Sequence, residues 1–315
     1  MRALRPRAAA LVHEALFYDG PESYLAGTVP FVESAASGGE PTLVVVPDKQ
    51  LVVLREHLRD VLDRDAPVRF VDMAEVGRNP NRILPWVLRA FVDEHLPRPV
   101  RIVGEPIWPG RAPEEIPACV AHEALVNVAL AGCPATLLCP YDVAGLPSGI
   151  RRYAERTHPF LLEGDDRRAS GGYTDPNSIL ELLNQPLPEP RHPAEVLVFE
   201  ANGLARVRHL VADRARQAGL SAERVADLQV AVNEVATNTL AHAAGPGTLR
   251  VWSDGDRVIC EVRGPGHIGD WLAGRIRPAA DSERGRGLLL ANRLCDLIQT
   301  YTRPESTVTR LHLRR

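Results

Sequence analysis

The sequence predicts an α/β protein with two domains: a first domain with three layers built on a mostly parallel sheet, and a second domain that is an α/β sandwich. Two observations support this prediction. Short β-branched runs alternate with helical patterns in the first half of the chain, as in parallel sheets covered by helices on both faces. The second half combines helical patterns with a hairpin signal and further strands, and a Pro-rich stretch separates the halves.

Length and charge agree with this division. A chain of 315 residues can bury two separate cores. Its 37 Lys and Arg nearly balance 40 Asp and Glu, so no basic surface for nucleic acid is indicated. No apolar run has the length of a transmembrane helix, and the run at 8–12 is too short for the core of a signal peptide. We therefore expect a cytoplasmic protein that binds neither nucleic acid nor membrane directly.

The cysteines indicate a reducing compartment. They are odd in number and have no C-x-x-C spacing, which favours buried free thiols and leaves a metal site as the alternative. The five residues are Cys119, Cys133, Cys139, Cys260 and Cys295.

The first domain is expected to span residues 1–164. Its predicted strands are the apolar runs at 42–46, 68–71, 100–103 and 135–138. Helical periodicity predicts helices at 51–62, 83–95 and 115–131. The strand at 42–46 is followed by Pro47-Asp48-Lys49-Gln50, which lacks the glycines of a phosphate-binding loop. We therefore expect this domain to bind no nucleotide through such a loop.

A Pro-rich linker is predicted at residues 165–193, with one short helical piece at 179–183. The second domain follows at 194–315. Its predicted helices are at 204–218, after Ser221 and at 287–296, and its predicted strands are at 195–201, 248–253, 257–263, 298–302 and 307–313. Helices on one face of a mixed sheet would make the sandwich.

One helix of the second domain carries the most informative pattern in the chain. Glu234, Asn238 and His242 are four residues apart and therefore lie on one stripe of the helix. A neighbouring stripe of valine and leucine is expected to face the core. A carboxylate and a carboxamide one turn apart can serve a hydroxyl group and a Mg²⁺ ion together. Taken alone, the pattern could equally be a polar helix face in solvent.

Two glycine-rich segments follow this helix: Gly264-Pro265-Gly266, and then Gly285-Arg286-Gly287-Leu288 at the start of another helix. Glycines at a helix start allow the backbone to approach a ligand closely, and the free N–H groups there bind phosphate oxygens. A lone G-x-G could also be a plain tight turn.

The helix and the two glycine segments together resemble the N, G1 and G2 boxes of the GHKL ATPase superfamily, and within it the anti-sigma-factor serine kinases. The resemblance implies a GHKL-type sandwich that binds ATP and Mg²⁺. It implies that Glu234 is the general base toward the attacking hydroxyl and that Asn238 holds Mg²⁺. We expect His242 at the pocket edge or in a hydrogen bond rather than in the chemistry. The other nucleotide contacts that the resemblance implies are Gly264, Gly266, Gly285, Gly287 and Leu288.

The sequence departs from the family pattern at Gly264. The family has an Asp at this position, which accepts a hydrogen bond from the adenine amino group. Asp270 lies too far along the chain to be a simple replacement. A hydrogen bond to a charged acceptor contributes roughly 1.5–3 kcal/mol, so its loss would weaken ATP binding about ten- to a hundred-fold. We therefore expect weak nucleotide binding, poor selectivity for adenine and little or no kinase activity.

The first domain resembles the MEDS-type sensory domain. The residues that carry this resemblance are His13, Phe17, Tyr18, 101–105, Trp108, Glu123, Asn127, 139–142, His158 and Pro159. We expect a sensory pocket at the carboxyl edge of the sheet, lined by His13, Glu105, Glu123 and Tyr141. Two alternatives stay open. These residues could make buried structural hydrogen bonds, or Cys139 with Tyr141 and His158 could sense a metal or a redox change.

These resemblances lead to three functional hypotheses. In the first, the chain is an anti-sigma factor that binds a sigma factor and phosphorylates an anti-anti-sigma (STAS) partner, controlled by a small-molecule ligand or partner on the first domain. In the second, the same module exchanges partners without catalysis. In the third, it is a remnant of a sensor histidine kinase, which is disfavoured because no His-bearing dimerisation helix precedes the second domain. A homodimer stays open.

Overall fold

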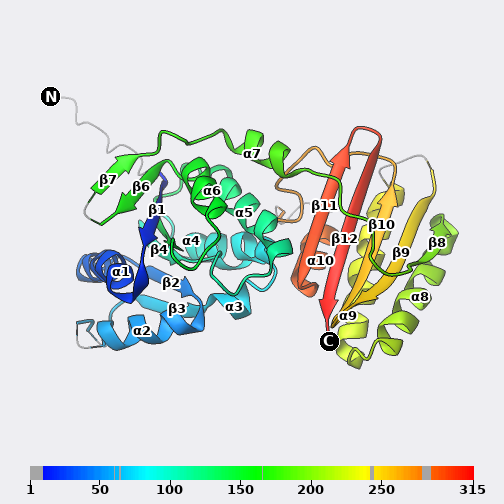
Figure 1. Ribbon diagram of the computed structural model, residues 1–315, viewed down its shortest axis with the longest axis horizontal. Helices are drawn as coiled ribbons and strands as arrows, with labels where there is room; N and C mark the ends of the chain where they lie inside the picture. The colour runs from blue at the N-terminus through cyan, green and yellow to red at the C-terminus, as the bar shows by residue number, and fades with distance from the viewer. Residues whose placement is uncertain (1–9, 60, 64, 165, 242–244, 279–284) are drawn as a thin grey trace. The chain divides into compact units, whose positions relative to one another are not determined.

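The computed structural model describes residues 10–59, 61–63, 65–164, 166–241, 245–278 and 285–315. The chain forms two compact units, Met1–Glu181 and Leu182–Arg315, coloured from blue to green and from green to red in Figure 1. Among the described residues, none of the helices combines the length and the hydropathy needed to cross a bilayer.

The first unit is built on a seven-stranded sheet with the order β3-β2-β4-β5-β1-β6-β7. Its strands are β1 (Val12–Tyr18), β2 (Thr42–Val46), β3 (Val68–Asp72), β4 (Val100–Gly104), β5 (Ala135–Asp142), β6 (Phe160–Glu163) and β7 (Asp166–Ala169). Neighbouring strands are parallel except β6 and β7, which form an antiparallel pair. The predicted mostly parallel sheet is therefore confirmed.

Helices cover both faces of this sheet and complete the three layers (Figure 1). The helices are α1 (Gly20–Ser37), α2 (Asp48–Leu58), α3 (Met73–Val76), α4 (Arg89–His95), α5 (Ile116–Ala129), α6 (Gly149–Thr157) and α7 (Pro176–Leu183), the last of which ends in the second unit. On the face covered by α1 and α2, Tyr24 and Leu54 pack against Val103 of β4. The packed pair α5 and α6 lies on the opposite face.

The sequence pattern does not predict β1 or α1. Two polar residues, His13 and Glu14, interrupt the apolar run of β1 although both are buried, and Pro30 lies inside α1. The predicted helix at 83–95 is an α-helix only in its α4 part. Residues Leu84–Leu88 form a wider π-type turn that contains Pro85, which has no N–H to donate to an α-helical hydrogen bond.

Part of the predicted linker is a strand. β7 pairs with β6 across a turn at Gly164, where φ is 58°. All four residues of β7 are exposed. A strand at the edge of a sheet needs no apolar side chains when neither of its faces meets the core. The charged run that suggested a linker is therefore compatible with an edge strand.

The second unit is a five-stranded sheet with the order β11-β12-β10-β9-β8, with helices on one face (Figure 1). Its elements are β8 (Glu195–Phe199), α8 (Leu204–Gln217), α9 (Ala222–Ala241), β9 (Gly247–Asp254), β10 (Arg257–Gly264), α10 (Arg286–Leu294), β11 (Leu297–Arg303) and β12 (Ser306–Arg314). The predicted sandwich is confirmed, but its sheet is antiparallel throughout and the expectation of a mixed sheet is wrong. The tight hairpins β9–β10 and β11–β12 enforce this direction, because a short turn joins only antiparallel neighbours.

The helix α9 is oriented by its apolar stripe. Val225, Leu228, Val232 and Val235 are at most 4% exposed and lie in the core between the helices and the sheet. Burial of this stripe fixes the rotation of α9 about its axis. The polar stripe that contains Asn238 is thereby presented beside the first turn of α10.

The segment between α7 and β8 packs on the second sheet. The Asn184 side-chain amide donates to the Thr302 carbonyl at 2.8 Å, and its carbonyl oxygen accepts from the Thr302 N–H at 3.0 Å. Arg310 Nη2 donates to the Pro188 carbonyl at 2.8 Å. This part of the predicted linker therefore covers the β11 edge and a part of the sheet face that carries Arg310.

Candidate functional site

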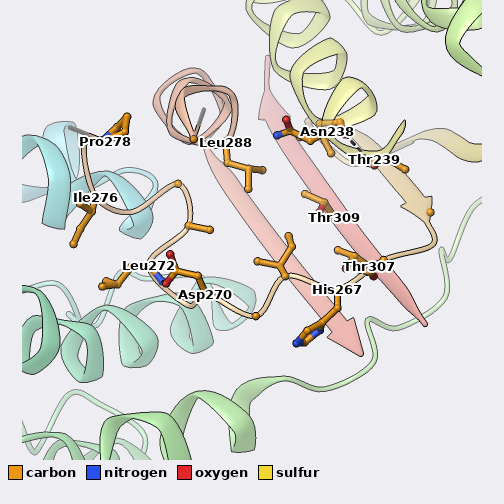
Figure 2. A pocket seen from close by; sticks show the side chains of 18 of the residues that line it. Asn238, Thr239, His267, Asp270, Leu272, Ile276, Pro278, Leu288, Thr307 and Thr309 are labelled. Atoms are coloured by element: carbon orange, nitrogen blue, oxygen red, sulfur yellow. Dashed lines mark hydrogen bonds between the residues drawn. The ribbon is translucent and has the colours of Figure 1, made fainter. Parts of the chain in front are cut away.

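A cavity of about 490 Å³ opens in the second unit, which is within the range of small-molecule sites. Its walls come from α9, β12, the start of α10 and the chain that follows β10. The lining residues are Val235, Asn238, Thr239, 264–270, 272–274, Ile276, Pro278, Gly285, Leu288, Thr307 and Thr309. Figure 2 shows Asn238 and Thr239 extending from α9 beside the strand that carries Thr307 and Thr309.

The structure brings most of the predicted nucleotide-site residues to this cavity. Those that line it are Asn238, Gly264, Gly266, Gly285 and Leu288. Glu234 is not part of the wall, but it joins the site through Gly287. A Cβ built on Gly287 would lie 2.7 Å from Glu234 Oε2 and 3.3 Å from Asn238 Nδ2. His242 lies outside the described residues.

The first turn of α10 is positioned to receive an anionic group. Gly285 precedes the helix with φ at 88°, a left-handed conformation that glycine adopts without steric cost. Gly285 and Leu288 both line the cavity. The N–H groups in the first turn of an α-helix have no acceptor within the helix, and they carry the positive end of the helix dipole.

Thr239 fills the space beside Gly264. A Cβ built on Gly264 would lie 2.0 Å from Thr239 Cγ2, closer than two such carbon atoms can approach. Thr239 Oγ1 donates to the Val235 carbonyl at 2.9 Å, which holds the side chain in its rotamer. The position where the adenine-binding Asp was expected is therefore without a side chain, and a methyl group occupies the adjacent space.

The Gly264–Gly266 turn is anchored to β11 and β12 by side-chain hydrogen bonds. Thr307 Oγ1 donates to the Gly266 carbonyl at 2.9 Å and lies 2.8 Å from Thr302 Oγ1, which accepts from the Ile268 N–H at 3.0 Å. Asp270 also lines the cavity, and its Oδ1 accepts from the Leu272 N–H at 2.9 Å. Asp270 thus closes a turn at the cavity wall.

The predicted sensory residues of the first unit are buried. His13, Glu105, Glu123 and Tyr141 are at most 2% exposed. Tyr141 OH donates to Glu123 Oε1 at 3.1 Å, and His13 Nε2 lies 3.2 Å from Glu123 Oε2. Because His13 is the second residue of β1, it lies toward the amino end of that strand. His13, Glu123 and Tyr141 form an interior network, and the burial of all four residues corrects the expectation that they line an open pocket at the carboxyl edge.

Glu105 belongs to a separate buried group. It follows β4, and its Oε1 accepts a hydrogen bond from Tyr18 OH at 2.9 Å. Its Oε2 and the hydroxyl of Tyr24 are buried with no hydrogen-bond partner among the described residues. Burial raises the pKa of Glu105 to about 8, against the smaller lowering effect of the hydrogen bond from Tyr18. Glu105 is therefore mostly protonated at neutral pH.

Two family models match the chain. The model of the MEDS domain (MEthanogen/methylotroph, DcmR Sensory domain) matches residues 12–159, and that of the histidine kinase-like ATPase domain matches residues 198–313. The chain joins a MEDS domain to a histidine kinase-like ATPase domain. The comparison with curated proteins finds no match.

One solved structure is similar to part of the chain. A crystal structure of the RsbU and RsbW domains of Rv1364c from Mycobacterium tuberculosis is 19% identical, with a TM-score of 0.30. The match covers 39% of this chain and 33% of that chain. A similarity this low carries no argument about the function of the ATPase-like domain.

The ATPase-like domain has residues that fit the polar parts of ATP. Asn238 would hold Mg²⁺ through its side-chain oxygen, and the first turn of α10 would hold phosphate oxygens. The adenine end fits less well, because Gly264 offers no carboxylate and Thr239 presents a methyl group there. Apolar contacts with residues such as Ile268 and Leu272 would have to hold the base.

Proposed function

We propose that the chain is a regulatory protein of the anti-sigma type. Its ATPase-like domain binds a sigma factor and an anti-anti-sigma (STAS) protein, and its MEDS domain controls this binding in response to a ligand or a partner. The observation that carries the proposal is that Glu234 and Asn238 both lie against Gly287, next to the cavity that Asn238 lines, since the sequence resembles the anti-sigma serine kinases at these positions. The proposed place of action is the cytoplasm, where sigma factors act.

Partner exchange is the main activity in this proposal, with nucleotide binding weak. The pairing of Gly264 with Thr239 supports this choice, because it removes the carboxylate acceptor for adenine and fills part of its space. Loss of such an acceptor weakens binding by about ten- to a hundred-fold. The domain would then bind its partners through its surface without a phosphorylation step.

Serine phosphorylation is the second candidate function. It is favoured by Glu234 and Asn238, which both lie against Gly287 at the first turn of α10. In this candidate Glu234 takes the proton of the attacking serine hydroxyl and Asn238 holds Mg²⁺. Both groups would need to act on a nucleotide that the domain holds only weakly.

Binding and phosphorylation assays with the full-length chain separate these functions. We would measure its binding to every sigma factor and STAS protein of the source organism, with and without Mg-ATP. We expect a complex with one sigma factor that forms without ATP, and no transfer of phosphate to the STAS protein. Absence of any sigma-factor complex would contradict the proposal. Phosphate transfer that disappears in Glu234→Ala would establish the second candidate.

A further inference from the structure

Four side chains with metal-binding atoms converge inside the MEDS domain. His13 comes from β1, Glu123 from α5, Cys139 from β5, and His158 directly follows α6. Their ligand atoms all lie within 4.8 Å of one another, and each residue is buried. The groups come from four separate elements, so their convergence is a property of the folded core.

Four of the six distances between these atoms are close to those of a tetrahedral metal site. His13 Nε2 lies 3.2 Å from Glu123 Oε2 and 3.4 Å from Cys139 Sγ. Glu123 Oε2 lies 3.5 Å from His158 Nε2 and 3.6 Å from Cys139 Sγ. With the bond lengths that Zn²⁺ makes to nitrogen, oxygen and sulfur, tetrahedral ligand atoms are about 3.3–3.6 Å apart. The two remaining distances, from His158 Nε2 to His13 Nε2 and to Cys139 Sγ, are at most 4.8 Å, so small side-chain shifts would let the four atoms surround one ion.

Asn127, which lies outside the cluster, fixes which ring nitrogen of His13 faces the other three side chains. Asn127 Nδ2 faces three backbone carbonyls, the nearest being that of Thr157 at 2.8 Å, so the Asn127 amide must point its NH₂ group toward them. Its Oδ1 then accepts a hydrogen bond from the Nδ1–H of His13 at 3.1 Å. Nδ1 is thereby engaged outside the cluster, and Nε2 is the ring nitrogen that faces Glu123 and Cys139.

His158 is held in the same way. Its Nδ1 lies 2.9 Å from the Ala154 carbonyl, which can only accept, so Nδ1 carries a proton. Its Nε2 is buried and makes no hydrogen bond among the described residues. The Nε2 atoms of both histidines therefore face the Glu123 carboxylate. A divalent cation at their centre would be bound by both nitrogens and by the carboxylate.

We propose that the MEDS domain binds one Zn²⁺ ion through His13 Nε2, Glu123 Oε2, Cys139 Sγ and His158 Nε2. A thiolate and a carboxylate together neutralise the divalent ion, so the buried site carries no net charge. Binding releases the thiol proton of Cys139 to solvent. Asn127 and the Ala154 carbonyl orient the two rings, and Tyr141 orients the carboxylate, as the outer partners of metal ligands do.

The proposed site is closed. Four protein ligands complete the tetrahedral coordination of Zn²⁺ and leave no position for a substrate, as in structural zinc sites. The ion would tie α5 and the segment after α6 to the central strands β1 and β5. The proposal concerns only the MEDS domain and does not depend on what the ATPase-like domain binds.

The test is the metal content of the full-length chain, purified without a histidine tag and without chelators, and measured by mass spectrometry after saturation with Zn²⁺ and gel filtration. We expect one zinc ion per chain in the wild type. Cys139→Ser and His158→Gln should each bind zinc at least ten-fold more weakly. Cys133→Ser is the matched control, because it removes a buried thiol of the same domain outside the cluster and should keep the ion.

Cobalt substitution gives a second readout. It uses only the wild-type protein, so it does not depend on whether a variant folds. A Co²⁺ ion at this site should give intense visible d–d bands of tetrahedral coordination and a near-ultraviolet thiolate-to-cobalt band. Wild-type protein that takes up substoichiometric zinc and shows no such bands would overturn the proposal. Zinc that is fully retained in Cys139→Ser and His158→Gln, or lost equally in Cys133→Ser, would also overturn it.

Discussion

Thr239 Cγ2 lies 2.0 Å from the point where a Cβ on Gly264 would stand. The last residue of β10 is thus matched to a β-branched residue of α9, and a side chain can be present at only one of the two places unless the other moves. The absence of a side chain at position 264 therefore goes together with the presence of the Thr239 methyl group.

This relationship predicts that Gly264→Asp alone will not restore tight nucleotide binding. The new Cβ would displace Thr239, and the substituted protein should lose stability with no gain in ATP affinity. The double variant Gly264→Asp with Thr239→Ser removes only the obstructing methyl group and keeps the hydroxyl. It should bind ATP about ten-fold or more tightly than the wild type, because a charged acceptor for the adenine amino group is regained. Calorimetric titration measures both affinities.

Thr239→Ser alone is the control for this experiment and should bind ATP as the wild type does. Tight, adenine-selective binding by the unaltered protein would show that another residue takes the role of the Asp. Equal gains from Gly264→Asp with and without Thr239→Ser would show that the methyl group is not an obstacle.

A second prediction concerns Gly287, which separates the first turn of α10 from Glu234 and Asn238. Gly287→Ala would place a Cβ 2.7 Å from Glu234 Oε2 and displace that carboxylate. We expect Mg-ATP affinity to fall several-fold. The free energy of unfolding should change by less than about 1 kcal/mol, because alanine is the better helix former. The control is Gly149→Ala in the first unit, where a Cβ would meet no atom within 4 Å, and it should leave Mg-ATP affinity unchanged.

A third prediction uses the protonation of Glu105. Its pKa rises from 4.5 to about 8 on burial, so between these values the folded state binds a proton that the unfolded state has released. The contribution of Glu105 to stability therefore decreases as pH rises through this window, by up to about 1.4 kcal/mol per pH unit, and levels off above pH 8. In Glu105→Gln this dependence should be missing.

Thermal unfolding of both proteins across this pH window checks the sign. Relative to the wild type, Glu105→Gln should become more stable as pH rises, since the amide cannot ionise next to the buried Tyr18 and Tyr24. Parallel stability curves for the two proteins would show that Glu105 keeps the same charge in the folded and unfolded states.

A fourth prediction concerns the ion pair on the outer face of the second sheet. Arg310 Nη2 donates to Glu261 Oε2 at 2.6 Å, and the side chains are 7% and 1% exposed. Glu261→Ala would leave the buried Arg310 guanidinium without its carboxylate, which should destabilise the protein by about 3–5 kcal/mol in denaturant unfolding. Glu189→Ala removes a carboxylate that is 74% exposed and should cost no more than about 1 kcal/mol. Similar losses in both variants would contradict this reading.

The sequence alone predicted the elements that are marked by a pattern of apolar residues or glycines within their own segment. The stripe of Val225, Leu228 and Val232 gave the rotation of α9, because helical periodicity reports directly which face is buried. The alternation of apolar runs and helical patterns gave the mostly parallel first sheet. The helix-opening glycines Gly285 and Gly287 marked the start of α10, where the cavity lies.

The sequence did not predict the strands that form only because residues distant in the sequence contact them. The strand β1 carries His13 and Glu14, polar residues that are buried only because α5, β5 and β7 supply partners for them. The strand β7 has an exposed, charged sequence, and only its pairing with β6 makes it a strand. In the second sheet, the antiparallel direction follows from the turns and packing that join the strands.

The tertiary structure alone decided which distant residues meet. The sequence pointed separately to Gly264 and to the helix of Asn238, but it did not indicate that Thr239 fills the space of the missing Asp. Likewise, Cys139 and His13 are 126 positions apart, yet their side chains lie 3.4 Å from each other. The hydrophobic periodicity of a segment indicates which of its faces is buried. Which segments become neighbours is determined by the packing of the whole domain, and the chemistry of both sites depends on it.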